Sequence, residues 1–73
     1  MYKNKDFIYR CKDGHFAAVY VNIRNGVDIN TMKMIGFGTY VTGLIYAASY
    51  NRESIVDILL ENGADVNKTK DEK

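Results

Sequence analysis

The sequence predicts an all-α fold in which two helix-turn-helix repeats are joined by an elongated β-hairpin-like finger loop. Three observations lead to this prediction. A six-residue motif occurs twice, the apolar residues before each copy keep the same register, and a glycine-containing segment rich in β-favouring residues separates the copies. A chain of 73 residues supports one hydrophobic core. We therefore expect residues 1–73 to form a single domain.

The repeated motif defines the two units. Asn25-Gly26-Val27-Asp28-Ile29-Asn30 recurs 37 positions later as Asn62-Gly63-Ala64-Asp65-Val66-Asn67. The same offset places Ile8 on Ile45, Tyr9 on Tyr46 and Val19 on Val56. This agreement predicts one repeat over residues 5–30 and a second over residues 42–67, followed by a polar tail at residues 68–73.

The first repeat is expected to hold two helices, at residues 7–12 and 16–24, with a break at Gly14 and an end at Gly26. In the second repeat, Thr42 is a good N-cap because its hydroxyl accepts a hydrogen bond from a free amide of the first turn. A short apolar helix at residues 44–48 follows, and residues 50–52 interrupt it.

The last helix is marked by an apolar stripe formed by Ile55, Val56, Leu59 and Leu60. Gly63 follows it, where a left-handed backbone favours glycine. Asp65 and Asn67 are expected to bond nearby backbone groups and fix the next turn.

Residues 42–48, Thr-Gly-Leu-Ile-Tyr-Ala-Ala, together with residues 61–67, Glu-Asn-Gly-Ala-Asp-Val-Asn, resemble an ankyrin repeat, whose motif reads T-P-L-H-x-A. Residues 5–30 match the family more loosely. Gly43 replaces the proline of the motif and Ile45 its histidine, so the usual threonine–histidine bond cannot form. The resemblance implies a fragment of an ankyrin-repeat solenoid.

The first repeat departs further from the family. Arg10 and Cys11 replace two close-packing alanines, and Asn22 stands where the family has leucine. These residues suit a terminal repeat whose outer face meets water. They are equally compatible with a degraded repeat that folds poorly alone.

The finger loop is expected at residues 31–41. Ankyrin repeats have a period of about 33 residues, and the additional residues here must lie between Asn30 and Thr42. Gly36 and Gly38 permit the positive φ angles of a hairpin tip. A phosphate-binding loop is disfavoured, because Val41 stands where a third glycine is needed and no G-K-[ST] sequence is present.

Composition argues against several other functions. Ten basic and nine acidic residues give a net charge of +1 without a basic stripe, so we expect no nucleic-acid binding. Cys11 and His15 have no further ligands at metal spacing, so we interpret them as a buried thiol and a helix-boundary histidine. No catalytic constellation is present. We expect no enzyme activity, cofactor or small-molecule substrate.

We expect the protein to lie in the cytoplasm, since no apolar run approaches membrane-spanning length and no signal peptide is evident. Lysine, asparagine, isoleucine and tyrosine fill 27 positions. Their AT-rich codons favour a parasite, a symbiont or a virus as the source, in which case the location is the host cytoplasm.

The resemblance implies a protein–protein interaction module that binds a partner along the first helices and the finger. Carried over by position, the binding residues are Tyr9, Lys12, Asp13, Met32, Met34, Phe37, Tyr40, Tyr46, Ser49 and Tyr50. Tyr9 and Tyr46 could instead pack between the repeats.

Two alternatives stay open. One is a small viral or symbiont protein that binds and inhibits a host complex. The other is a self-associating fragment of a longer array, in which a homodimer covers the exposed C-terminal repeat through Tyr50, Ile55 and Ile58.

Overall fold

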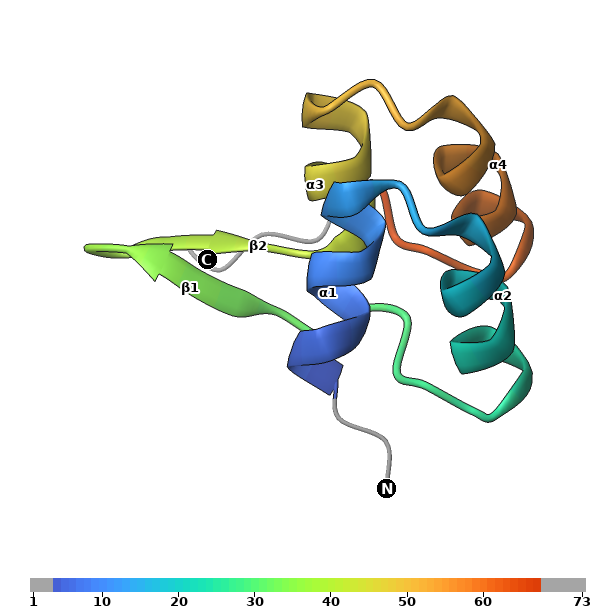
Figure 1. Cartoon of the computed structure of the whole chain (residues 1–73). Helices are drawn as coiled ribbons and strands as arrows, with labels where there is room; N and C mark the ends of the chain where they lie inside the picture. The colour runs from blue at the N-terminus through green and yellow to red at the C-terminus, as the bar shows by residue number, and fades with distance from the viewer. Residues whose placement is uncertain (1–3, 68–73) are drawn as a thin grey trace.

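The computed structural model describes residues 4–67, with side chains from residue 6 onward, so the expected polar tail at 68–73 lies outside the described residues. Along the chain, one hairpin connects two helix pairs. In chain order the elements are α1 (Asn4–Asp13), α2 (Phe16–Arg24), β1 (Lys33–Gly36), β2 (Thr39–Val41), α3 (Gly43–Ser49) and α4 (Glu53–Glu61). In Figure 1, α1 and α3 form an inner layer, α2 and α4 form an outer layer, and the hairpin projects from the inner side.

The predicted helix-loop-helix units are confirmed. The α2 helix has the expected bounds, whereas α1 begins three residues earlier than predicted and α3 is one residue longer at each end. Thr42 caps α3 as expected, since its Oγ1 accepts a hydrogen bond of 3.2 Å from the backbone N–H of Ile45. Gly63 leaves α4 with a φ of 95°, the left-handed conformation predicted for it.

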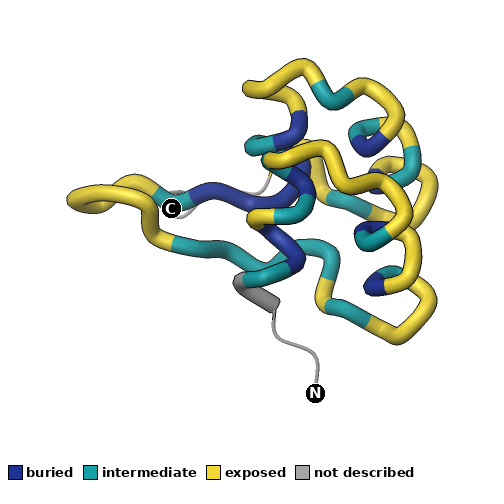
Figure 2. Tube along the Cα trace, in the orientation of Figure 1, coloured by how far each residue is buried: buried dark blue, intermediate teal, exposed yellow. Residues whose placement is uncertain are grey.

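The core lies between the two helix pairs, where Figure 2 shows the buried segments facing one another. Its buried apolar members are Phe7, Ile8, Cys11, Val19, Val41, Leu44, Ala47, Ile55 and Leu59. The two inner helices approach closely at Gly43. A Cβ added there would lie 2.8 Å from Cys11 Sγ, closer than real Cβ contacts. Glycine at this position therefore permits the packing of α3 against α1.

Two side chains tie the repeats together in a way that the sequence did not reveal. Asn30 Oδ1 accepts a hydrogen bond of 2.7 Å from the Asp65 N–H, and its Nδ2 donates to the Gly63 carbonyl at 3.3 Å. Arg52 Nε donates to the Lys12 carbonyl at 2.9 Å. A cation at this position also complements the negative C-terminal end of α1.

The structure buries two residues that the sequence pattern associated with exposed faces, and the prediction for Ile55 is wrong. Ile55, expected on the uncovered face, is 2% exposed because α4 turns it into the core beside Phe7 and Val19. Asn22, which suited either a water-facing terminal repeat or a degraded one, is only 9% exposed. Among the described residues, its Oδ1 has no hydrogen-bond partner.

The finger is an antiparallel hairpin, as predicted. Lys33 pairs with Val41, Met34 with Tyr40 and Gly36 with Thr39, and the register is irregular at Ile35. The prediction for the tip is only half right. Gly38 has a positive φ of 73°, but Gly36 lies in β1 without one because the turn falls at residues 37–38.

Candidate functional site

Three tyrosines gather around one lysine on the inner helices. Lys12 Nζ lies 5.8 Å from the ring centroids of Tyr9 and Tyr46 and 5.7 Å from that of Tyr50. Lys33 Nζ lies 5.4 Å from the Tyr9 centroid. We call these five residues, Tyr9, Lys12, Lys33, Tyr46 and Tyr50, the tyrosine–lysine cluster.

The positions of these residues follow from helical spacing and from the packing of α1 on α3. Tyr9 and Lys12 are three apart on α1, and Tyr46 and Tyr50 are four apart at the end of α3, so each pair shares one helix face. The rings of Tyr46 and Tyr50 meet edge to face, with centroids 5.8 Å apart and planes at 85°. Lys33 joins from β1. The cluster thus unites both helix pairs and the finger.

The cluster carries two positive charges. Ammonium groups over aromatic rings are stabilised by about 0.5–1 kcal/mol at exposed sites. The rings orient the lysines without neutralising them. Among the side chains that the structure describes, residues 6–67, neither lysine forms an ion pair with a carboxylate. Tyr9 and Tyr50 are 39% and 47% exposed, so the cluster is accessible to a partner.

The end of the finger presents apolar side chains to solvent. Phe37 is fully exposed, and Met34 and Ile35 are about half exposed. Met32 and Tyr40, nearer the base of the finger, are half-buried. The finger therefore offers an apolar tip beyond the cluster.

The structure brings together four of the ten predicted binding residues, namely Tyr9, Lys12, Tyr46 and Tyr50. Asp13 is exposed and shares a shallow hollow on α1 with Tyr9 and the side chains of Asp6, Arg10 and His15. Ser49 is exposed at the end of α3. Met32, Met34, Phe37 and Tyr40 lie on the finger, as expected.

Sequence reasoning missed Lys33 and Ile35. Side chains alternate between the two faces of a strand, so Lys33 and Met34 lie on opposite faces of β1. The sequence held no sign that the Lys33 face meets α1.

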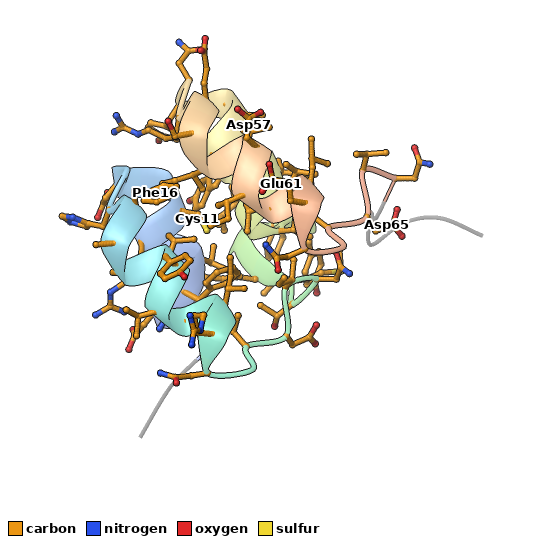
Figure 3. The ribbon with its side chains drawn as sticks, turned by 90° about the vertical axis from the view of Figure 1, so that its right-hand side faces the viewer. Cys11, Phe16, Asp57, Glu61 and Asp65 are labelled. Carbon is orange, nitrogen blue, oxygen red and sulfur yellow. The ribbon has the colours of Figure 1, made fainter. Side chains whose placement is uncertain are left out.

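The outer helices carry a similar but separate pair. Arg24 lies over the Tyr20 ring, 5.8 Å from its centroid, and donates a hydrogen bond of 3.1 Å to the Tyr20 hydroxyl. Figure 3 views the α2 and α4 side, where Phe16 and Asp57 lie on the near surface and Cys11 lies deeper between the ribbons.

Cys11 is fully buried, which confirms the prediction of a buried thiol. Burial raises the pKa of its thiol from 9.0 to about 12, because the thiolate loses its hydration. In residues 4–67, no group of three or more His, Cys, Asp or Glu side chains is placed to hold a metal ion. None of the helices within that range has the length and apolar character needed to cross a bilayer.

The second repeat matches the model of a known protein family. Residues 41–71 match the family model described as Ankyrin repeat, a segment that includes all of α3 and α4. No curated protein matches the sequence significantly. Ankyrin repeats are generally protein–protein interaction modules and are generally not enzymes. The resemblance to the ankyrin repeat family is thus confirmed for residues 41–71.

Proposed function

We propose that the chain is a non-enzymatic protein-binding module whose contact surface is formed by α1, α3 and the finger. The observation that carries this proposal is the tyrosine–lysine cluster, to which both helix pairs and the finger contribute. The proposal takes residues 5–30 and 42–67 as two repeats of one solenoid fragment, joined by the finger at residues 31–41.

The composition of this surface is typical of protein interfaces. Tyrosine is enriched there because it supplies a large, rigid contact area with a polar end. The exposed Phe37 adds an apolar side chain on a narrow projection, a shape that suits insertion into a pocket of the partner. An exposed apolar group of this kind has no role in the core of the chain.

Affinity capture with matched variants tests the proposal. The wild type, Tyr46→Ala/Tyr50→Ala, Phe37→Ala and the control Tyr20→Ala are used to capture proteins from an extract of the cell in which the chain is made. Tyr20 is the control because its exposure, 43%, is close to the 47% of Tyr50 and it lies on the outer helix α2.

The supporting result is a partner retained by the wild type and by Tyr20→Ala but lost from the Tyr46→Ala/Tyr50→Ala variant. A partner lost only from Tyr20→Ala would place the contact surface on the outer helices and contradict the proposal. Circular dichroism of each variant separates lost binding from lost folding.

A second candidate function is self-association through the C-terminal side of the second repeat. Ile8, Cys11 and Val19 are fully buried, yet the residues that match them 37 positions later, Ile45, Ala48 and Val56, are half-buried or exposed. Leu60 is 44% exposed. Burying a large apolar side chain contributes about 1.5–3 kcal/mol, so covering this face would stabilise the chain.

The surface proposed for self-association is therefore Ile45, Ala48, Val56 and Leu60, in place of the set that included Ile55. Sedimentation over a range of concentrations tests it. Leu60→Lys should shift a dimer toward monomer, whereas Val21→Lys, at a similarly exposed position of α2, should not. A wild type that stays monomeric at high micromolar concentration would contradict it.

The sequence also led to expectations about localisation, origin and excluded partners. Cytoplasmic localisation, a viral or symbiont origin with inhibition of a host complex, and the lack of nucleic-acid, membrane and small-molecule partners stay predictions from the sequence. Immunofluorescence of the tagged chain in its own cell checks the first of them.

A further inference from the structure

We propose that the tyrosine–lysine cluster recognises an acidic segment of a partner protein, whose Asp or Glu carboxylates contact Lys12 and Lys33. This inference rests on the proposed function, because it names the chemistry of the partner at the same surface.

The arrangement of charge supports the inference. The ammonium groups of Lys12 and Lys33 lie 5.8 Å and 5.4 Å from the Tyr9 ring centroid, one from α1 and the other from the finger. Like charges held near one ring repel each other, and the ring quadrupole lessens that repulsion only in part. A carboxylate of the partner at either ammonium group would form a charge-assisted hydrogen bond with it and offset this repulsion.

The acidic residues within the described part of the chain do not fill this role. Asp6 and Asp13, the acidic residues of α1, line the hollow that also includes Tyr9, Arg10 and His15. Among the side chains of residues 6–67, no carboxylate lies within ion-pair distance of either lysine. The two ammonium groups therefore keep donors for a carboxylate supplied from outside.

A protein segment fits this surface better than a nucleic acid. Lysines and aromatic rings together can also bind single-stranded nucleic acids, but bases stack on free ring faces and the strand follows a basic groove. Here Lys12 already lies over three rings, and the Tyr46 and Tyr50 rings meet edge to face. The net charge is only +1.

Peptide selection on the intact chain tests the inference. Random dodecapeptides are displayed and selected separately on the wild type, on Lys12→Gln/Lys33→Gln and on Arg24→Gln. Arg24 is the matched control because its guanidinium also lies over a tyrosine ring, at 5.8 Å from the Tyr20 centroid on α2. We expect the wild type and Arg24→Gln to enrich Asp and Glu, and the double variant to lose this enrichment.

Titration of one selected peptide gives the magnitude. Replacing its Asp and Glu by Asn and Gln should weaken binding to the wild type about tenfold, which equals about 1.4 kcal/mol. The same loss should follow from Lys12→Gln/Lys33→Gln, whereas Lys12→Arg/Lys33→Arg should keep the preference. Binding by the wild type should also weaken as salt rises, because dissolved ions screen the charge pairs.

The outcomes separate this inference from the proposed function. If the wild type selects peptides without an excess of acidic residues, or if the double variant keeps that excess, acidic recognition is wrong while protein binding stands. If the wild type selects no peptide, or binds a single-stranded oligonucleotide in their place, both are wrong. Thermal denaturation checks the folding of each variant, and Lys33→Gln alone, on the finger, replaces the double variant if that one fails to fold.

Discussion

Replacing Gly43 by alanine should destabilise the protein, because α1 and α3 meet at this position without room for a side chain. An ideal Cβ at Gly43 would lie 2.8 Å from Cys11 Sγ and 3.2 Å from Phe7 Cε2. Both neighbours are fully buried, so neither can move into solvent. Overpacking of a core costs about 1–3 kcal/mol, and the better helix propensity of alanine returns at most about 1 kcal/mol. We expect a net loss of about 1–2 kcal/mol from the free energy of unfolding.

A double-mutant cycle identifies the cause. Cys11→Ala removes the sulfur atom that the new Cβ would meet, so the double variant Cys11→Ala/Gly43→Ala should be more stable than the sum of the two single effects predicts. Coupling between residues in contact is about 0.5–3 kcal/mol. Urea denaturation followed by circular dichroism measures all four proteins, and an unchanged m-value shows that the midpoint reports stability.

Gly36→Ala provides the control for glycine replacement itself. A Cβ added at Gly36 would have no heavy atom within 4 Å, and the φ of Gly36 is not positive, so the change in stability should be near zero. The reasoning is refuted if Gly43→Ala is neutral or stabilising. It is also refuted if the effects of Cys11→Ala and Gly43→Ala simply add.

Three further predictions concern the repeat turns and the buried thiol. Gly63→Ala should cost about 1 kcal/mol in urea denaturation, because φ is 95° with nothing near the added Cβ and only backbone strain acts; a change near zero would contradict this cause. Asn30→Ala should cost about 1–2 kcal/mol in the same assay, since it removes both hydrogen bonds to the second turn; the matching change Asn67→Ala should cost less, and equal losses would contradict the tie between repeats. Iodoacetamide should alkylate Cys11 far more slowly in the native protein at pH 8 than in urea, because the raised pKa of about 12 leaves little thiolate; equal rates would contradict its burial. Because this pKa is raised on folding, the contribution of Cys11 to stability is complete below pH 9 and is lost as the pH rises toward 12.

The sequence was sufficient for features that depend on local pattern. The α2 helix, the Thr42 cap and the left-handed Gly63 follow from apolar spacing and from the chemistry of helix ends. The hairpin was predicted from an excess of residues between two aligned repeats and from glycines flanked by β-favouring residues. The helix ends depend on neighbours within a few positions, and the hairpin depends on the spacing of the two repeats along the chain.

Features that depend on how the elements pack were missed or predicted wrongly. Asn22 stands where the second repeat has Leu59, and a polar residue there suggested an exposed face. The structure buries it and leaves Oδ1 without a partner among the described residues. Lys33 was missed for the same reason, because its role depends on where the finger meets α1.

The candidate site depends on the same packing that fixes the fold. Lys12 on α1 reaches the rings of Tyr46 and Tyr50 on α3 because glycine at position 43 permits the close approach of the two helices. Tyr9 and Tyr50 are exposed and lie outside the core, whereas Tyr46 is partly buried and packs against it. Changes to Tyr9 and Tyr50 should therefore reduce binding with a small effect on folding. Gly43→Ala should reduce both, because moving α3 away from α1 separates the lysine from two of its three rings.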